Sequence, residues 1–482
     1  MSFTQFVERF WQDIAAWAVL LDIVVTVLVL VWVLHLKRET MSAIAWSLTV
    51  LLVPFLGALL FFLFGYQWVE RPLRRKQERL RLFKKICAWS AGTSVPVPRR
   101  WRRLARLAEH TEGFPVTAGN RVTFYHDGAE AFAAMQQAIA AARDHVHIQF
   151  FIFRSDRSGA AFLEALCAAA RRGVTVRFLY DSIGAHDLSR SWLQRLRQAG
   201  GHHAPFLPVL NPLYRLRVNL RNHRKILVVD GRIAFTGGFN IGDEYLGLQR
   251  RYGYWRDTHL RLEGPAVAGL QRVFLEDWHF ASNEAVQGEQ YYPKWSQPPG
   301  QVLAQVVASG PDSEYKAIRE TYFAAIVQAR QRVWLASPYF VPDLGLRDAL
   351  CLAARSGVDV RFLTLFRPDK WLPFLAARFY WNDLLDAGGK IYQYLPGMLH
   401  CKCLLVDGQW ASVGTANFDN RSLFLNFEVN CQFFDPAVTR CLEEQFLRDL
   451  AHSVRVDPDV FARRPWMSRI FENAARLFSP VL

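Results

Sequence analysis

The stretch His223-Arg-Lys-Ile-Leu-Val-Val-Asp230 recurs 177 positions later as His400-Cys-Lys-Cys-Leu-Leu-Val-Asp407. Both stretches spell H-x-K-x4-D. Each is followed at the same offset by a tail that ends in asparagine, Gly237-Gly-Phe-Asn240 and Gly414-Thr-Ala-Asn417. One H-x-K arises easily by chance, but two copies in register with matching tails indicate a duplicated unit.

The duplication extends upstream of both motifs. Residues 165–179 and 349–363 share the pattern A-L-C-x-A-A-R-x-G-V-x-V-R-F-L. In each copy an apolar strand precedes an alanine-rich helix, which ends at Gly173 or Gly357 before a second apolar strand. This is the βαβ pattern of a largely parallel sheet, so the predicted fold class is α/β with two related halves. The first copy has seven extra residues around 202–217, which we expect to form a loop near the site.

Each motif is expected to combine an extended segment with a turn. The apolar run after the lysine ends in Asp-Gly at 230–231 and at 407–408, which is a strong hairpin signal. Alternation along a strand would place the histidine and lysine of one motif on the same face, about 7 Å apart. Turn chemistry alone explains both aspartates, so within the motifs we assign them a structural role.

Two imidazoles and two ammonium groups in one cleft would suit a phosphodiester. Reaction at phosphorus needs an attacking group, a proton donor for the leaving alkoxide and fixed donors for the nonbridging oxygens. A single motif could simply be a solvated strand edge, whereas pseudo-twofold symmetry would bring both histidines into one cleft. The candidate catalytic residues are those of the two motifs, and the tail asparagines are candidate substrate-binding residues: His223, Lys225, Asp230, His400, Lys402, Asp407, Asn240 and Asn417.

Two apolar runs near the start of the chain, residues 14–36 and 43–64, are each long enough to span a bilayer as a helix of about 33 Å. They predict a hairpin of two transmembrane helices over 1–66. A signal peptide is the alternative for the first run, but no small-residue cleavage site follows it and a second apolar run comes at once. Asp22 is expected to face the partner helix or reach an interface.

The net charge of +15 is concentrated beside these runs. Residues 67–107 contain thirteen Lys or Arg and two Glu, and we expect a basic membrane-proximal linker over 67–115. Such a linker places the following residues on the cytoplasmic side and attracts anionic headgroups by about 1 kcal/mol per basic residue. This distribution argues against a nucleic-acid partner. The two halves are expected over 116–295 and 296–482.

No metal site or cofactor is expected. Seven cysteines show neither a disulfide framework nor zinc spacing, which indicates reduced thiols in the cytosol. His202 and His203 are adjacent, with His186 nearby, and we interpret them as part of a polar loop. His145 and His147 alternate along a strand, which indicates packing or edge positions.

The paired motifs and their tails resemble the phospholipase D superfamily over nearly all of the chain after about residue 115. Three further strings and the apolar hairpin make the chain similar to the bacterial cardiolipin synthases of that superfamily: Asn240-Ile-Gly-Asp-Glu-Tyr245, Tyr254-Trp-Arg-Asp-Thr-His259 and Ser337-Pro-Tyr-Phe-Val-Pro-Asp343. The resemblance implies metal-independent transfer of a phosphatidyl group from one phosphatidylglycerol to another through a phosphohistidine, with release of glycerol.

The resemblance also implies roles for individual residues. His223 would be the nucleophile and His400 the acid and then the base, although nothing in the sequence breaks the symmetry and the reverse stays open. A carboxylate after each motif would orient a nearby imidazole. Glu428 matches the family position, and Asp257 is the candidate in the first half. The alternative for Asp257 is a purely structural hydrogen bond at the start of a strand. Gly238 stands where the superfamily often has serine.

The resemblance implies a multi-pass protein of the bacterial inner membrane with a cytoplasmic catalytic part, and phosphatidylglycerol and anionic lipids as partners. The oligomeric state is not indicated. A lipid hydrolase, a nuclease of the same superfamily and a non-enzymatic scaffold remain as alternatives, and phosphatidylethanolamine could replace one phosphatidylglycerol. The amphipathic stretch 466–482 could rest on the membrane or pack on the catalytic body.

Overall fold

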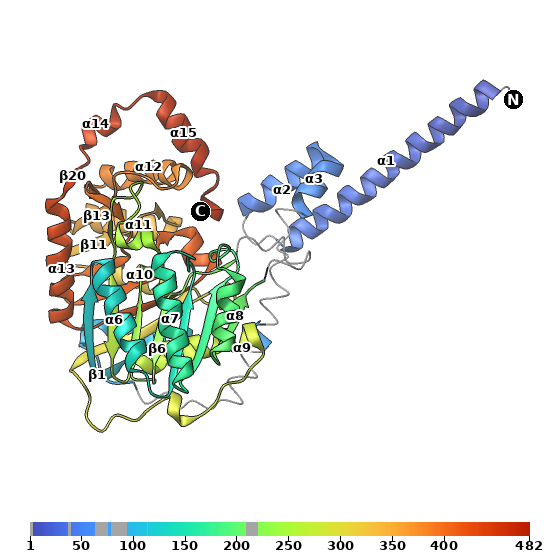
Figure 1. Cartoon of the computed structure of the whole chain (residues 1–482). Coiled ribbons are helices and arrows are strands. Elements are labelled where there is room, and N and C mark those ends of the chain that lie inside the picture. The colour runs from blue at the N-terminus through green and yellow to red at the C-terminus, as the bar shows by residue number, and fades with distance from the viewer. Residues whose placement is uncertain (1–2, 37–39, 63–75, 79–93, 113, 209–219) are drawn as a thin grey trace. The chain divides into compact units, whose positions relative to one another are not determined.

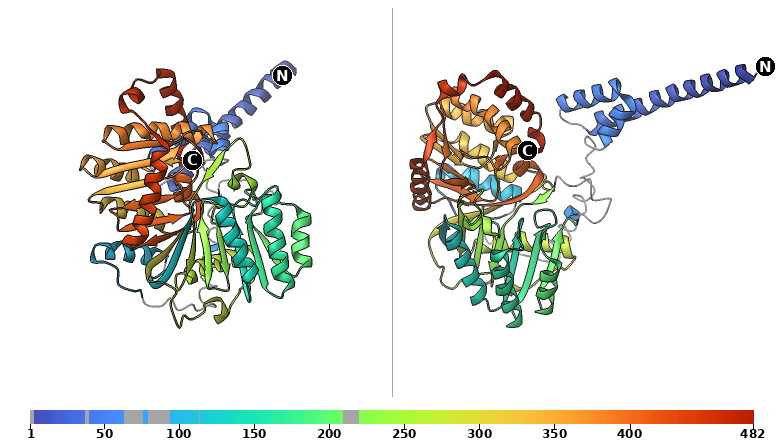
Figure 2. Two further views of the ribbon diagram at one scale, coloured as in Figure 1. Left: turned by 60° about the vertical axis from the view of Figure 1, so that its left-hand side comes forward. Right: turned by 45° about the horizontal axis from the view of Figure 1, so that its top comes forward.

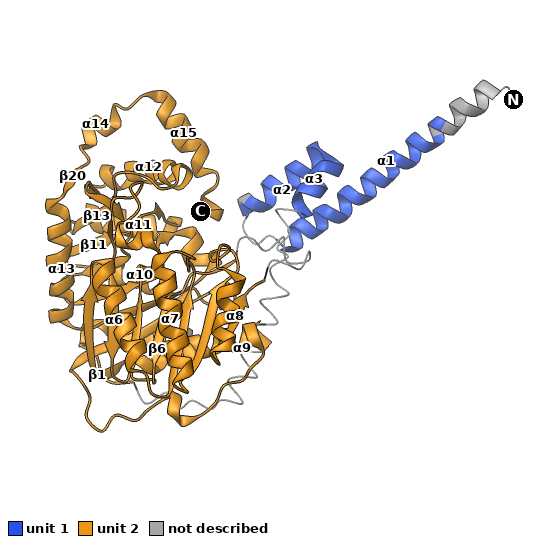
Figure 3. Cartoon of the chain, viewed as in Figure 1, with its two compact units in different colours: residues 1–73 blue, residues 74–482 orange. Residues whose placement is uncertain are grey.

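The computed structural model describes residues 3–36, 40–62, 76–78, 94–112, 114–208 and 220–482. They belong to two compact units, Met1–Leu73 and Arg74–Leu482 (Figure 3). Most of the predicted basic linker before residue 94, and positions 209–217 of the predicted extra loop, lie outside the described residues.

The first unit consists of the helices α1 (Phe3–Leu36), α2 (Thr40–Leu52) and α3 (Pro54–Leu60). Among the described residues, α1 alone is long and apolar enough to cross a membrane, over Asp13–Leu36. The prediction of a second continuous span over 43–64 is wrong. Val53 leaves the helical region (φ −139°, ψ 74°) before Pro54, as expected because proline restricts the preceding residue, and α2 is therefore only about 20 Å long.

Asp22 lies on the side of α1 that packs against the other two helices. It is half-buried. Thr26 follows it by one helical turn and Val29 by two, and the same face of α1 continues to Val33. Val29 and Val33 pack in a small apolar cluster with residues of α2 and α3. The structure thus places this carboxylate on the packed face of α1.

The first half of the second unit is an α/β layer structure (Figure 1). Its strands pair in the order β4-β3-β2-β6-β7-β9-β1. Helices α6, α7 and α8 form one group against these strands, while α9 contacts β2, β4, β6 and β7. In chain order the elements are β1 (Thr117–Tyr125), α6 (Gly128–Ala141), β2 (His145–Phe150), α7 (Arg157–Arg171), β3 (Thr175–Asp181), α8 (Arg190–Gln198), β4 (His202–Phe206), β5 (Arg221–Asn222), β6 (Ile226–Val229), β7 (Ile233–Gly237), β8 (Tyr254–Arg256), β9 (His259–Glu263) and α9 (Val267–Ser282).

The second half repeats this order as β14-β13-β11-β16-β17-β19-β10, with β20 added at its edge. Antiparallel pairing of β1 with β10 joins the halves into one sheet, visible from two sides in Figure 2. The elements are β10 (Val302–Ser309), α10 (Ala317–Val327), β11 (Arg332–Ala336), β12 (Phe340–Val341), α11 (Leu344–Arg355), β13 (Asp359–Leu365), α12 (Trp371–Asp386), β14 (Lys390–Tyr394), β15 (Gly397–Leu399), β16 (Cys403–Val406), β17 (Trp410–Gly414), β18 (Phe418–Asp419), β19 (Asn426–Phe433), α13 (Pro436–Ala451), β20 (Ser453–Arg455), α14 (Pro458–Ala462) and α15 (Trp466–Arg476).

The matching strand orders confirm the predicted duplication and the α/β class. Both predicted βαβ units are present, because β2 pairs in parallel with β3, and β11 with β13. The expectation of a largely parallel sheet is wrong. Each half contributes one parallel three-stranded edge, and the motif hairpin then turns the chain back, so the strands from β6 to β1 and from β16 to β10 are antiparallel.

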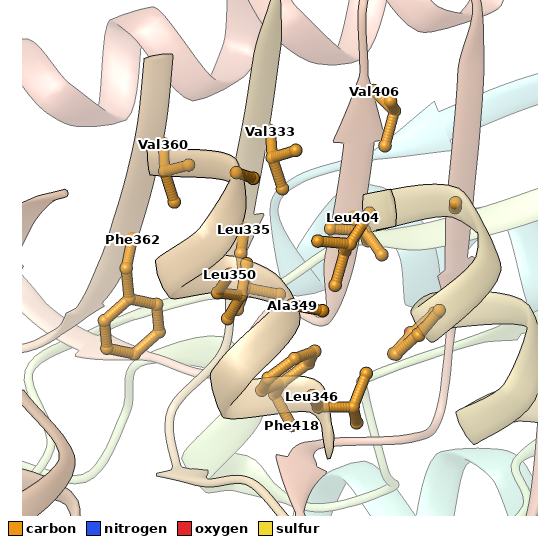
Figure 4. Packing of buried hydrophobic residues seen from close by; sticks show 14 of the residues in the cluster. Val333, Leu335, Leu346, Ala349, Leu350, Val360, Phe362, Leu404, Val406 and Phe418 are labelled. Atoms are coloured by element: carbon orange, nitrogen blue, oxygen red, sulfur yellow. The ribbon is translucent and has the colours of Figure 1, made fainter. Parts of the chain in front are cut away.

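Apolar side chains from the strands and helices of the second half form a large core. Its members lie on the strand faces turned toward α10, α11 and α12. Trp101 and Leu104, which precede the predicted start of the first half, are fully buried in the same core, so helix α5 (Arg102–Glu112) belongs to this body. Figure 4 shows part of the cluster: Val333, Leu335, Leu346, Ala349, Leu350, Val360, Phe362, Leu404, Val406 and Phe418.

The histidines outside the motifs have structural positions. His145 and His147 lie on β2, an interior strand, and face α9, where Gln271 hydrogen-bonds to both rings at 3.2 and 2.7 Å. The packing interpretation is therefore confirmed. The polar-loop interpretation of His202 and His203 is wrong, since both lie on β4, which pairs with β3.

Helix α15 contacts α12. The buried face of α15 carries small and charged residues. Glu472 is buried and accepts hydrogen bonds from Arg378 (2.8 Å) and Arg464 (2.7 Å), beside the buried Ala475. Its apolar residues are exposed instead: Trp466, Met467, Ile470, Phe471, Leu477 and Phe478.

Both motif hairpins have the predicted Asp-Gly turn. Val229 pairs with Ile233 across the first turn, in which Asp230 and Gly231 have φ of 52° and 60°. The equivalent residues of the second turn, 407 and 408, have φ of 55° and 65°. Two consecutive left-handed residues match the twist of the flanking strands, which explains the Asp-Gly sequence.

The two turn aspartates also bind the chain that leads into the neighbouring strand. The Asp230 carboxylate accepts hydrogen bonds from three consecutive backbone N–H groups, those of residues 143–145, at 2.8–3.0 Å. The Asp407 carboxylate accepts them from residues 330–332, each at 2.8 Å. Each aspartate therefore fixes the start of β2 or β11 against the motif hairpin.

Asp230→Ala and Asp407→Ala are expected to lower the stability of the fold more than the turnover rate of the folded protein. Each change leaves backbone donors without their acceptor, which costs about 1–3 kcal/mol for each N–H that is buried. The cost is smaller at residues 143 and 144, which are exposed and can donate to water. The melting temperature of the full chain in detergent should fall, while turnover per folded molecule changes less than about fivefold. Loss of turnover with an unchanged melting temperature would instead assign the aspartates to the chemistry.

Candidate active site

The two motif histidines are placed by matching short strand pairs between the halves. Arg221–Asn222 of β5 pairs in parallel with Asn426–Phe427 of β19. In the same way, β15 pairs in parallel with β8. The ladders continue through the histidines themselves, because the His223 N–H donates to the Phe427 carbonyl (3.0 Å) and the His400 N–H to the Arg256 carbonyl (2.8 Å).

These ladders bring each imidazole to a carboxylate of the opposite half. His223 Nδ1 lies 3.0 and 3.1 Å from the two carboxylate oxygens of Glu428. His400 Nδ1 lies 2.8 Å from Asp257 Oδ2. Both carboxylates are fully buried. A hydrogen on Nδ1 that binds the carboxylate leaves Nε2 as the nitrogen for attack or proton transfer.

Both histidines line one cavity of about 750 Å³. Asn240 and Asn417 line it as well. Asn240 is held in place, since its Oδ1 accepts from the Ile152 N–H (3.1 Å) and its Nδ2 donates to the Tyr245 hydroxyl (3.0 Å). Asn417 Oδ1 has no hydrogen-bond partner among the described residues. The volume is in the range of binding sites for small molecules.

The two motif lysines lie behind the histidines and are buried. Lys225 Nζ donates to the His223 carbonyl (2.7 Å), and Lys402 Nζ donates to the His400 carbonyl. Lys402 Nζ also lies 2.9 Å from His400 Nδ1. Asp257 competes for the same nitrogen, and its carboxylate favours the tautomer with hydrogen on Nδ1, so Lys402 acts there as a neighbouring charge.

Burial sets the protonation of the histidines and lysines. Burial, reinforced by Lys225 and Lys402, holds the pKa of His223 well below its ordinary value. Burial and then Lys402 lower the pKa of His400 to about 4, against the opposing effect of Asp257. Burial lowers the pKa of Lys225 to about 7 despite Glu428 nearby. In the empty cavity both imidazoles are therefore neutral at pH 7.

The two carboxylates differ from each other. Burial raises the pKa of Glu428 to about 7, although Lys225 and the hydroxyl of Thr415 oppose it. Burial also tends to raise the pKa of Asp257, but Lys402 and His400 outweigh it and hold that pKa below its ordinary value. Asp257 is thus ionised at neutral pH, whereas Glu428 is partly protonated.

A tail position also distinguishes the surroundings of the two carboxylates. Thr415 donates its hydroxyl to Glu428 Oε2 at 2.6 Å. The equivalent residue of the first half is Gly238, where an added Cβ would lie 1.8 Å from Asp257 Oδ1. The second half therefore has a hydroxyl beside its carboxylate, and the first half has room only for hydrogen.

Gly238→Ala is expected to displace Asp257 from His400. The added methyl group cannot share the space of the carboxylate, so the Nδ1 hydrogen bond lengthens or breaks. Turnover should fall by at least ~10-fold, as for the loss of a group that orients a reacting imidazole. The check is kcat for Gly238→Ala beside Gly173→Ala, a control in which the added methyl group meets no neighbouring atom and only strains the backbone at φ 89°, away from the site. Equal activity of both variants would contradict this account.

Three supporting side chains were not predicted from the sequence. Besides Thr415, Arg256 forms a two-pronged pair with Asp449 (2.9 and 2.7 Å) next to Asp257. Arg224, between the histidine and lysine of the first motif, donates to the Glu428 carbonyl (3.1 Å) and to Asp277 (2.7 Å). Their polar types were visible in the sequence, but no spacing pattern links them to partners so distant along the chain.

Known proteins resemble this chain over most of its length. The family model described as "Cardiolipin synthase, PLD-like domain" matches residues 135–278 and 322–450, and "Phospholipase_D-nuclease N-terminal" matches residues 24–65. The cardiolipin synthase of Geobacillus thermodenitrificans is 41% identical over 456 residues, 92% of this chain and 90% of the relative. That of Geobacillus kaustophilus is 40% identical over 484 residues, 98% and 95% of the two chains.

Similarity to a solved structure supports the fold alone. The crystal structure of phosphatidylserine synthase from Haemophilus influenzae Rd KW20 superposes with a TM-score of 0.60 at 15% identity. It covers 79% of this chain and all of the solved chain. The second unit therefore has the same general architecture as that protein.

Proposed function

The chain belongs to the cardiolipin synthases of the phospholipase D superfamily, and we propose that the cavity lined by both motif histidines performs both half-reactions on one histidine. It is a phosphatidyltransferase, and its substrates are phospholipids. The overall reaction joins two phosphatidylglycerol molecules into cardiolipin and releases glycerol. One phosphodiester replaces another, so no nucleotide is consumed.

In the first half-reaction, His223 Nε2 attacks the phosphorus of the donor lipid. A P–N bond forms and the P–O bond to the headgroup glycerol breaks. His400, which takes up a proton from solvent on Nε2 when the anionic phosphate enters the cavity, gives that proton to the departing oxygen. In the second half-reaction a hydroxyl of the acceptor gives its proton back to His400 and attacks phosphorus. Its P–O bond replaces the P–N bond, and both histidines return to their starting state.

The residues around the histidines hold the charge that develops. An anionic phosphate in the cavity favours the charged forms of Lys225 and Lys402, which lie behind the histidines and stabilise the nonbridging oxygens. Asn240 and Asn417 provide amide donors at the cavity wall. The Asp257 carboxylate stabilises the imidazolium that forms on His400 after it accepts a proton, and Glu428 orients His223. Asp230 and Asp407 act only through the backbone that they hold.

One observation carries this proposal: both motif histidines line the same cavity, each hydrogen-bonded to a buried carboxylate of the opposite half. A nucleophile and an acid on opposite sides of one phosphate need that arrangement. Two separate sites, one in each half, would not require the two histidines to line the same cavity.

We also propose how the chain relates to the membrane. The apolar part of α1 is the anchor, and the basic residues of 67–107 place the catalytic unit on the cytoplasmic side of a bacterial inner membrane. A second full span is not proposed, because α2 is too short for it. The repeated strand order supports the division into halves at 116–295 and 296–482, although α5 adds a segment before the first boundary.

Product analysis tests the proposed function. Purified full-length protein is incubated in mixed micelles with phosphatidylglycerol labelled in both its acyl and its headgroup parts. Cardiolipin and free glycerol in equal amounts are the expected products. Phosphatidic acid with glycerol would identify a hydrolase, and absence of both cardiolipin and glycerol would contradict the proposed function. Phosphatidylethanolamine as the added second lipid reveals whether it can replace the acceptor.

A further inference from the structure

The two sides of the cavity are related by the internal duplication, but their charges differ. The motif offset of 177 that relates His223 to His400 also relates Arg221 to Met398 and Glu244 to Arg421. Arg221, Glu244 and Arg421 all line the cavity. One side of the repeated frame thus carries two arginines where the other carries a methionine and a glutamate. Asp419 also lines the first side, where its equivalent is Gly242, and Arg154 lines the second side beside Glu244.

The backbone supports these equivalences. Arg221 and Met398 occupy matching places in the two cross-half ladders, each two residues before its histidine. Arg421 begins the short helix Arg421–Leu425, and Glu244 lies in the corresponding short helix Asp243–Leu246. Glu244 and Arg421 each lie four residues after the tail asparagine of their half, although the first short helix is a 3-10 helix and the second is a π-helix. The two charged side chains therefore occupy equivalent positions in the repeated frame.

The positive charge of Arg421 acts on Arg221, and both side chains line the cavity. Burial lowers the pKa of Arg221, and Arg421 lowers it further, while Asp181 opposes both. Burial likewise lowers the pKa of Arg421 against the attraction of Asp419 and Asp181. Arg221 is 4% exposed. Two guanidinium groups that repel each other at a cavity wall gain when an anion enters between them.

From this asymmetry we infer that Arg221 and Arg421 form a subsite for the unreacting phosphate of the acceptor phosphatidylglycerol. The inference deepens the proposed function and rests on it. Only one phosphate can lie between the histidines at a time. The acceptor brings a second one, separated from its attacking hydroxyl by a single glycerol unit. Planar guanidinium groups bind phosphate through paired hydrogen bonds, which suits this task better than a point charge.

This subsite gives the second half-reaction a requirement that the first lacks. The glycerol that leaves the donor is uncharged, and so is the water that would resolve the phosphohistidine in a hydrolase. An anionic acceptor alone would gain from the arginine pair. The subsite would therefore raise transfer to phosphatidylglycerol relative to transfer to other hydroxyl groups.

The experiment compares two acceptors on the same phosphohistidine. Full-length protein receives phosphatidylglycerol micelles together with labelled free glycerol. Glycerol attacks the phosphohistidine, its hydroxyl proton passes to His400, and labelled phosphatidylglycerol results. Cardiolipin and labelled phosphatidylglycerol are then quantified in the same reaction. Their ratio reports acceptor choice and does not depend on the fraction of folded protein.

Arg421→Gln and Arg221→Gln are each expected to lower this ratio by at least ~10-fold, the size of one lost charge-assisted hydrogen bond. Arg421→Lys keeps the charge without the planar fork and should give an intermediate ratio. Arg347→Gln on α11, whose arginine pairs with Asp348, is the matched control and should leave the ratio unchanged.

The outcomes separate the inference from the proposed function. An unchanged ratio in Arg421→Gln or Arg221→Gln, whether or not both products decline together, overturns the arginine subsite. If parent protein forms neither cardiolipin nor labelled phosphatidylglycerol, the proposed function itself fails. If one glutamine variant is too unstable to purify, the other and Arg421→Lys still decide the result through the same ratio.

Discussion

His223→Ala and His400→Ala should each lower cardiolipin formation by roughly 10⁴-fold or more, because each removes a nucleophile or a proton donor from a single reaction centre. The double variant should be no slower than the slower single variant. Groups that act as a unit in one step lose their effect together, so the free-energy changes do not add.

Steady-state rates of the three variants in phosphatidylglycerol micelles check this prediction. His186→Ala is the control, since His186 is hydrogen-bonded only to the nearby Ile183 carbonyl in the described structure and lies outside the cavity lining. Its rate should match that of the parent. Effects of the two motif variants that multiply in the double variant would indicate two independent sites, one in each half.

Asp257→Asn should be far more damaging at pH 6 than Glu428→Gln. Asp257 is ionised there because its pKa is held below its ordinary value, so the amide removes a real charge beside His400. The pKa of Glu428 is raised to about 7, so below pH 7 the parent already has a neutral carboxyl group that glutamine imitates. We expect a loss of at least ~100-fold for Asp257→Asn and less than ~10-fold for Glu428→Gln at pH 6.

The difference between the activity losses of Asp257→Asn and Glu428→Gln should narrow as the pH rises. Glu428 loses its proton as the pH passes through about 7, and the glutamine variant then lacks a charge that the parent has. Profiles of kcat from pH 5.5 to 9 therefore check whether the deficit of Glu428→Gln grows with pH and whether it does so near pH 7. A deficit of Glu428→Gln that is constant across this range, or equal losses for the two variants at pH 6, would contradict the assigned protonation states.

Local sequence patterns sufficed for the hairpins and the duplication. Asp-Gly after an apolar run fixes two consecutive left-handed residues, which few other pairs tolerate, so the turns at 230–231 and 407–408 could be predicted residue by residue. The repeated string around Gly173 and Gly357 made the two βαβ units recognisable for the same reason.

Long-range pairing could not be predicted. The family resemblance suggested Asp257 and Glu428 as candidate orienting carboxylates, but not that each would lie against the histidine of the other half. That arrangement depends on β5–β19 and β8–β15, short ladders between segments that no spacing relates. The mixed sheet was missed because the βαβ signal dominates the local pattern, whereas antiparallel pairs such as β1 with β9 and β10 with β19 join strands that lie far apart in the chain.

The break in the second apolar run was visible in principle. Pro54 lies inside the stretch 43–64. The prediction of a continuous span relied on the apolar composition of this stretch and gave no weight to the proline. Hydropathy records how apolar a segment is, but a proline decides whether its backbone can continue as one helix.

The central claim is that the two halves share one reaction centre. It is tested most directly by the stoichiometry of trapped lipid: the parent protein is mixed with acyl-labelled phosphatidylglycerol, quenched in base, and the label per chain is measured, with its position found by peptide mass spectrometry. The account predicts no more than one phosphatidyl group per chain, attached to His223. Two groups per parent chain, one on each motif histidine, would contradict it.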